Sequence, residues 1–197
     1  MSIQHLIPPW LVSLVPYQPG KPIEEVEREY GIRDSIKLAS NENPLGPSPR
    51  AMVALGEAIR GVHRYPDGGG FYLKRKLAAK HGVDAEQLIL GNGSNEVLEL
   101  LARTFLRPGE DAVMSEQAFV VYASVVQAAA GVPRAVPLKC FTHDLDGILA
   151  AVRKSTRLVY LGNPNNPTGT IYRRGEFERF LDRLPKDVVV VADDAYA

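Results

Sequence analysis

The feature that most restricts the fold of this chain is an alternation of short apolar runs with longer amphipathic segments from residue 87 onward. The apolar runs predict strands at residues 87–91, 111–114, 133–138, 157–162 and 188–193. The segments between them predict helices at residues 94–106, 119–131, 145–153 and 174–184. Strands that are apolar throughout are typical of a parallel sheet whose two faces are both covered by helices. We therefore predict an α/β fold, an α-β-α sandwich around a mainly parallel sheet.

The first part of the chain is less regular and contains many turn-forming residues. It predicts a helix at residues 21–31, a short strand at 35–39, and two further helices, at 50–60 and in the segment that ends at Gly82. Ser48 and Pro49 suit the cap and the first turn of the helix that follows them.

Composition excludes several classes of function. The chain has 23 basic and 23 acidic residues, so no net charge favours nucleic acid or an anionic membrane. Cys140 is the single cysteine, which excludes an internal disulfide. No run approaches the roughly 20 apolar residues of a membrane helix, and the proline-broken opening segment does not resemble a signal peptide. We expect a cytoplasmic protein.

Parallel sheets bind ligands beyond the carboxyl ends of their strands, and the first such end is the segment LGNGSNE, residues 90–96. Its glycines allow a ligand close to the backbone, and the N–H groups that begin the next helix suit an anion, most naturally a phosphate. A simple helix cap at Ser94 explains the segment equally well. Glu96 stands where a dinucleotide fingerprint needs its third glycine, and the Lys of a P-loop is missing.

Two further strand ends carry unusual residues. The segment NPNNPTG, residues 163–169, has a density of turn formers that exceeds the needs of a turn, and its asparagines could direct an amide at a ligand. Asp193 ends the last predicted strand, where a carboxylate needs a cationic partner, and Tyr196 follows three residues later. A helix cap or half of a magnesium site are the alternatives for Asp193 and Asp194.

Together these segments resemble the fold-type I pyridoxal-phosphate enzymes, the class I/II aminotransferases, and within them the histidinol-phosphate aminotransferase branch. The motifs that carry the resemblance are LASNENPLGPSP, RYPDG, LGNGSNEVLELL, NPNNPTG and DDAY, in the order and with the spacing of that family. The resemblance implies an N-terminal arm and small-domain segment at residues 1–47. It implies that residues 48–197 are part of the large, cofactor-binding domain, incomplete at the C-terminus.

The resemblance also implies a role for each site residue. Gly93, Ser94 and Asn95 would hold the phosphate of pyridoxal 5'-phosphate. Asp193 would pair with the protonated pyridine nitrogen, while Asn166 and Tyr196 would hydrogen-bond the phenolic oxygen of the ring. These last three residues are the catalytic candidates, and no metal is expected.

Further contacts follow from the same resemblance. Phe119 would stack on the ring, although packing in the core explains an aromatic residue there as well. Tyr65 would reach the cofactor of a neighbouring subunit, which implies a homodimer. Tyr17 and Asn41 would lie near the substrate.

The implied reaction is amino transfer between histidinol phosphate and 2-oxoglutarate in histidine biosynthesis. Aromatic amino acid aminotransferases and threonine-phosphate decarboxylase-like enzymes share most of these motifs and remain alternatives.

The family's Schiff-base lysine would lie beyond Ala197, so we expect the chain to be the amino-terminal portion of an aminotransferase. We expect no turnover from residues 1–197 alone, because the reaction needs that amine as a base. A non-catalytic cofactor-binding fragment is one rival. A dinucleotide-dependent dehydrogenase with Glu116 at the second strand end is another, disfavoured by the missing glycine.

Overall fold

The structure, a computed structural model, describes residues 3–38 and 40–197. The chain forms two compact units, of which the first combines Met1–Tyr17 with Ile89–Ala197 and the second is Gln18–Leu88. The boundary expected at residues 47/48 concerns the domains of a complete aminotransferase and stays a prediction.

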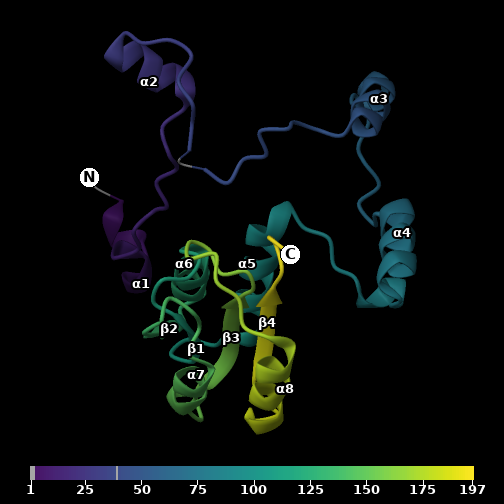
Figure 1. Cartoon of the computed structure of the whole chain (residues 1–197). Helices are drawn as coiled ribbons and strands as arrows, with labels where there is room; N and C mark the ends of the chain where they lie inside the picture. Colours follow the sequence, from purple (N-terminus) through teal and green to yellow (C-terminus); the bar gives the residue numbers. More distant parts are fainter. Residues whose placement is uncertain (1–2, 39) are drawn as a thin grey trace. The chain divides into compact units, whose positions relative to one another are not determined.

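A parallel sheet of four strands forms the centre of the first unit, in the order β2-β1-β3-β4 (Figure 1). The strands are β1 (Asp111–Ser115), β2 (Val132–Val136), β3 (Thr156–Gly162) and β4 (Val189–Asp193). The strand order reverses between β1 and β3, because β1 continues to β2 on one side and β3 to β4 on the other. Crevices at such a reversal are where open α/β sheets bind ligands.

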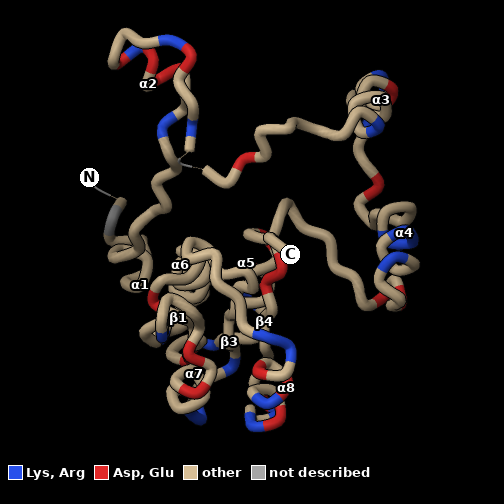
Figure 2. The backbone as a smooth tube through the Cα atoms, viewed as in Figure 1, with Lys and Arg blue, Asp and Glu red and all other residues tan. Residues whose placement is uncertain are grey.

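Helices cover the two faces of this sheet. They are α5 (Gly93–Phe105), α6 (Val121–Ala128), α7 (Leu145–Ala151) and α8 (Arg174–Arg183). The unit also contains η1 (Gln4–Leu6) and α1 (Pro9–Val12), and Gln127 Nε2 in α6 donates to Trp10 O at 2.7 Å. In Figure 2 α8 carries many charged residues, whereas α6 carries none.

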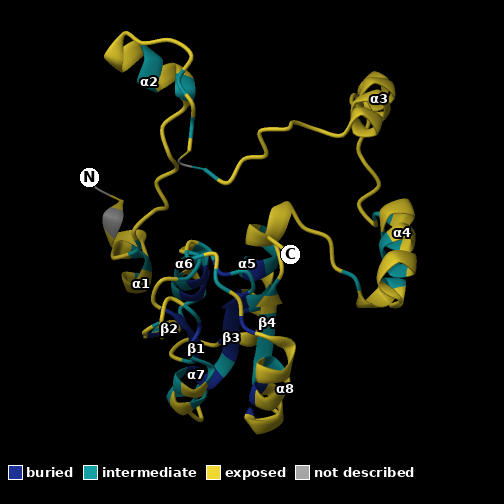
Figure 3. Ribbon diagram, viewed as in Figure 1, coloured by how far each residue is buried: buried dark blue, intermediate teal, exposed yellow. Residues whose placement is uncertain are grey.

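Two apolar cores lie on opposite faces of the sheet, as the alternation of side chains along a strand requires. Ala112 and Leu158 belong to the core with α5 and α6, whereas their neighbours Val113 and Val159 belong to the core with α7 and α8. Figure 3 shows the buried residues concentrated in these strands. The predicted α-β-α sandwich with a parallel sheet is confirmed.

The second unit consists of α2 (Ile23–Tyr30), α3 (Pro49–Ala58), η2 (Ile59–Gly61), α4 (Phe71–His81) and η3 (Ala85–Gln87). The predicted helices are present, and α2 and α4 end at Gly31 and Gly82, both in the left-handed conformation. None of the described residues of this unit is buried. Within residues 3–38 and 40–197, no helix has the length and apolar character of a membrane span.

Two predicted strands are wrong. Residues 35–38 and 88–91 form no strand, and Ala39 lies outside the described residues. An apolar run becomes a strand only where a neighbouring strand completes its hydrogen bonds, and these two runs pair with none among the described residues.

Candidate active site

The carboxyl ends of β3 and β4 lie next to each other. Gly162 and Asp193, the last residues of the two strands, are register partners, and the Asn163 N–H donates to the Asp193 carbonyl oxygen at 3.0 Å. The chain continues from β3 into the loop 163–170 and from β4 into Asp194 and Tyr196. Two of the three strand ends singled out in the sequence therefore meet at one edge of the sheet.

A small cavity of about 40 Å³ opens at this edge. Its lining residues come from the start of α5, the start of α6, and the ends of β3 and β4; they are Ser94, Phe119, Tyr122, Gly162, Pro164, Asn166, Asp193, Ala195 and Tyr196. Five of the residues expected from the sequence are among them, so the structure brings together residues that lie up to 102 positions apart.

The loop 163–170 is held by its own asparagines. Asn165 is buried, and its Nδ2 donates to the Gln117 carbonyl oxygen at 2.9 Å and to Thr168 Oγ1 at 2.8 Å. Asn163 Oδ1 accepts from the Tyr172 N–H at 3.0 Å. Both Asn-Pro bonds are cis. The next asparagine, Asn166, is half-buried and lines the cavity, and its Nδ2 donates to Tyr196 Oη at 3.2 Å.

Asp193 has a different partner from the cation expected for it. Tyr122 Oη donates to Asp193 Oδ2 at 2.7 Å, and the Ala195 N–H donates to Oδ1 at 3.1 Å. Burial and the neighbouring carboxylate raise the pKa of Tyr122 well above its usual value, so this phenol stays protonated as a donor. Within the described residues, two neutral donors contact this carboxyl group, and a cationic ligand would complement it.

Sequence reasoning missed Tyr122. Its position three residues after Phe119 was the available signal, because residues at that spacing share one face of a helical turn. The two rings do meet edge to face, with centroids 5.8 Å apart and planes at 89°. Phe119 is half-buried, so it packs in the core and lines the cavity at the same time.

The start of α5 contributes Ser94 to the cavity. Gly93 precedes it at φ = +71°, a conformation that favours glycine. Glu96 turns back on the loop, where its Oε2 accepts from Asn92 Nδ2 at 3.0 Å. Gly93 and Asn95 flank Ser94 in the chain but do not line the cavity. The first N–H groups of a helix have no intrahelical acceptor, and they form the positive end of its dipole.

Three further expected site residues are exposed and are not among the residues that line this cavity. Tyr65 and Asn41 belong to the second unit and are exposed, and Tyr17 in the first unit is exposed as well. Their assignment to cofactor and substrate contacts stays a prediction.

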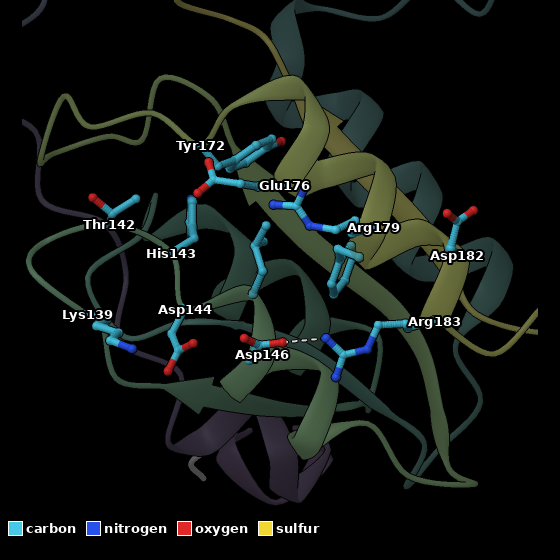
Figure 4. A pocket seen from close by; sticks show the side chains of 12 residues that line it. Lys139, Thr142, His143, Asp144, Asp146, Tyr172, Glu176, Arg179, Asp182 and Arg183 are labelled. Carbon is cyan, nitrogen blue, oxygen red and sulfur yellow. Dashed lines mark hydrogen bonds and ion pairs between the residues drawn. The ribbon is translucent and has the colours of Figure 1, made fainter.

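A larger groove of about 500 Å³ lies elsewhere, between α7 and α8 (Figure 4). None of the expected site residues lines it, and the ion pair of Arg183 with Asp146 at 2.5 Å crosses it. Both ring nitrogens of His143, which lines the groove, form hydrogen bonds. Nδ1 lies 2.7 Å from Ser115 Oγ, and Nε2 lies 2.9 Å from the Gly162 carbonyl oxygen. Burial raises the pKa of Tyr172 to about 12, so this phenol is not ionised at neutral pH. The groove therefore offers no available base or nucleophile from these groups.

The polar groups at the small cavity suit three kinds of ligand group. A carboxylate suits a protonated ring nitrogen, an amide and a phenol suit an anionic oxygen, and a helix start suits a phosphate. No group of three or more potential metal ligands occurs in the described part of the chain. The fold and this cavity are typical of α/β proteins that bind a small ligand at the carboxyl ends of parallel strands.

Comparison with known proteins identifies the family of this chain. The family model described as "Aminotransferase class I and II" matches residues 33–197. The chain belongs to this family.

Individual relatives are similar over nearly the whole chain. It is 51% identical to histidinol-phosphate aminotransferase 2 of Nitrosospira multiformis, over 100% of this chain and 50% of that protein. It is 51% identical to histidinol-phosphate aminotransferase of Moorella thermoacetica, over 95% of this chain and 48% of that protein. The chain spans about half the length of these curated relatives.

A solved structure of a protein with the same name as these relatives is also similar to this chain. The structure is similar to that of histidinol-phosphate aminotransferase from Sinorhizobium meliloti in complex with pyridoxal-5'-phosphate, with a TM-score of 0.86 and 30% identity. The match covers 96% of this chain and 51% of that one.

Proposed function

We propose that this chain is the cofactor-binding part of a pyridoxal-phosphate-dependent histidinol-phosphate aminotransferase. The reaction is amino transfer between histidinol phosphate and 2-oxoglutarate, a step of histidine biosynthesis. The observation that carries the proposal is that Ser94, Asn166, Asp193 and Tyr196 line one cavity. The chain is also 51% identical in sequence to proteins named histidinol-phosphate aminotransferase.

The donor set of the cavity fits pyridoxal 5'-phosphate. When bound, this cofactor supplies a cationic ring that accepts electrons from the substrate carbon. The carboxylate of Asp193 would keep the proton on the ring nitrogen. The Asn166 amide and the Tyr196 hydroxyl, which already lie 3.2 Å apart, would share the phenolic oxygen of the ring.

The start of α5 would hold the phosphate. Ser94 can donate from its hydroxyl and its N–H, and the N–H groups of Gly93 and Asn95 lie beside it in the chain. The hydrogen bond from Asn92 Nδ2 turns the Glu96 carboxylate toward the preceding loop. This orientation lets an acidic residue occupy the first turn beside a bound phosphate.

The remaining assignments follow from the family. Phe119 would cover one face of the ring, and Tyr65 would reach the phosphate of the partner subunit's cofactor in a homodimer. Tyr17 and Asn41 would contact the substrate. A cytoplasmic location belongs to the same proposal.

Binding of pyridoxamine 5'-phosphate to the chain tests the cavity. This amine form carries the ring nitrogen, the phenolic oxygen and the phosphate, and it cannot form an imine with surface lysines. Asp193→Ala should weaken binding by roughly 10- to 100-fold, the range of a hydrogen bond to a charged group. The measurement is fluorescence titration.

Asp146→Ala is the matched control, because it removes an acidic side chain in the groove and should leave the affinity unchanged. Equal affinities for the unaltered chain and Asp193→Ala would contradict the proposed ring contact.

A chimera tests the reaction. Residues 1–197 would be continued by the carboxyl-terminal half of the Nitrosospira multiformis relative, and glutamate formation from 2-oxoglutarate would be followed with histidinol phosphate as the donor. We expect turnover with histidinol phosphate and less with phenylalanine or tyrosine. A preference for the aromatic donors would favour the aromatic aminotransferases instead.

A further inference from the structure

A buried hydroxyl group lies directly behind the carboxylate of Asp193. Tyr122 is only 2% exposed, and its Oη donates to Asp193 Oδ2 at 2.7 Å. The other oxygen, Oδ1, accepts from the Ala195 N–H at 3.1 Å. With one protein donor on each oxygen, the plane and direction of the carboxylate are set before any ligand arrives.

The position of Tyr122 is itself closely determined. Its ring stacks on Tyr160, with centroids 5.0 Å apart and planes at 15°, and the Phe119 ring meets it edge to face. A β-carbon at position 162 would come within 3.2 Å of Tyr122 Oη, so Gly162 leaves room for the hydroxyl at the end of β3. These contacts leave the hydroxyl little freedom other than to point at Asp193.

We propose that Tyr122 is a positioning residue for the cofactor's ring nitrogen, acting by aiming the Asp193 carboxylate at it. The inference rests on the proposed function, because it requires that Asp193 meets this nitrogen. In metal sites, removing a group that orients a direct ligand typically costs 10- to 100-fold in affinity, and we expect an effect of the same order here. Tyr122 suits this role because burial and the adjacent carboxylate raise its pKa, so that it remains a donor.

The test compares two ligands that differ at one ring atom. The first is pyridoxamine 5'-phosphate, and the second is its analogue with carbon in place of the ring nitrogen. The unaltered chain should bind the first more tightly, because only it offers Asp193 a nitrogen. Tyr122→Phe keeps the ring stack and should lower this preference roughly tenfold, leaving the affinity for the carbon analogue unchanged.

Two further variants isolate the effect. Tyr160→Phe removes another buried tyrosine hydroxyl, one that donates to the Leu98 carbonyl oxygen at 3.3 Å and not to Asp193, and it should keep the preference. Asp193→Ala should abolish the preference, and adding Tyr122→Phe to it should change nothing more, since the two residues act as one unit.

The outcomes separate this inference from the proposed function. A preference that survives Tyr122→Phe, or an equal loss of affinity for both ligands, would show that Tyr122 only supports the fold. An unaltered chain that binds neither ligand, or both alike, would overturn the proposed function and this inference with it.

A spectroscopic measurement covers the case in which Tyr122→Phe does not fold. With 3-fluorotyrosine at position 122, the ¹⁹F resonance should shift more on binding pyridoxamine 5'-phosphate than on binding the carbon analogue. Equal shifts would mean that the hydroxyl does not sense the ring nitrogen through Asp193, and they would overturn the inference.

Discussion

At the scale of single residues, His143 shows how one hydrogen bond decides which ring nitrogen carries the hydrogen. The Gly162 carbonyl oxygen can only accept, so His143 Nε2 must carry the hydrogen, and Nδ1 must accept from the Ser115 hydroxyl. Burial lowers the pKa of His143, because the charged imidazolium would lose its hydration. This neutral ring links the end of β1 to the end of β3, next to the candidate site.

The stability of the chain should therefore fall in mild acid. Below about pH 6.5 the unfolded chain binds a proton at His143 that the folded chain resists, so the free energy of unfolding decreases as the pH falls from 8 toward 5. Urea unfolding at several pH values measures this slope. His143→Gln should flatten it, whereas His63→Gln, at an exposed histidine, should not. An unchanged slope in His143→Gln would contradict the assignment.

At the scale of elements, the turn 139–142 shows a local conflict. Lys139 and Thr142 exchange two backbone hydrogen bonds of 2.9 and 3.0 Å, which closes a two-residue hairpin. The residues between them, Cys140 and Phe141, have φ values of 50° and 61°. Two positive φ angles are typical of a type I′ turn, which favours Asn-Gly, because a side chain at such angles clashes with the backbone.

Replacing Cys140 and Phe141 by Asn and Gly should therefore stabilise the chain, by about 1 kcal/mol. Urea denaturation gives the change in the free energy of unfolding. Phe141→Ala serves as the control, since it removes the exposed ring but keeps the β-carbon, and it should give no such gain. A double variant no more stable than the unaltered chain would mean that the turn is not strained.

At the scale of the whole molecule, the two units differ in how their apolar residues are used. The first unit buries two apolar cores against its sheet, on the faces of α5 and α6 and of α7 and α8. In the second unit, α2, α3 and α4 contain no buried residue. Helices of this length are marginal in water without tertiary packing, so the second unit should open far more readily than the first.

Limited digestion with trypsin should make this difference visible. The first cuts should fall at lysines and arginines within residues 18–88, and a fragment that contains β1 to β4 should persist. Mass spectrometry of the products over time identifies the order of cleavage. Early cuts between residues 111 and 193 would contradict the assignment of the stable core to the sheet.

Much of the fold follows from local patterns. Residues 112–114 and 158–162 form apolar runs between amphipathic segments, which is enough to predict parallel strands covered by helices. The runs at 35–39 and 87–91 have similar composition, but composition does not say whether a neighbouring strand is present. The strands predicted at these two runs are wrong for that reason.

The candidate site likewise contains residues that the sequence indicates and contacts that it does not. Asn166 and Asp193 could be predicted because each lies at or just beyond the end of an apolar strand, where parallel sheets bind ligands. Tyr122 has the appearance of an ordinary core residue of α6, and only its spacing from Phe119 indicates the site; its contact with Asp193, 71 residues away, has no local signal.

The sequence by itself determined the helices, the four strands of the sheet and the edge at which the polar residues gather, because hydrophobic periodicity and strand direction are local properties of the chain. Only the tertiary structure decided which donor meets the Asp193 carboxylate and which asparagine of the loop 163–170 lines the cavity. The physical reason is that a hydrogen bond needs two groups within about 3 Å, and packing alone brings together groups that are distant in sequence.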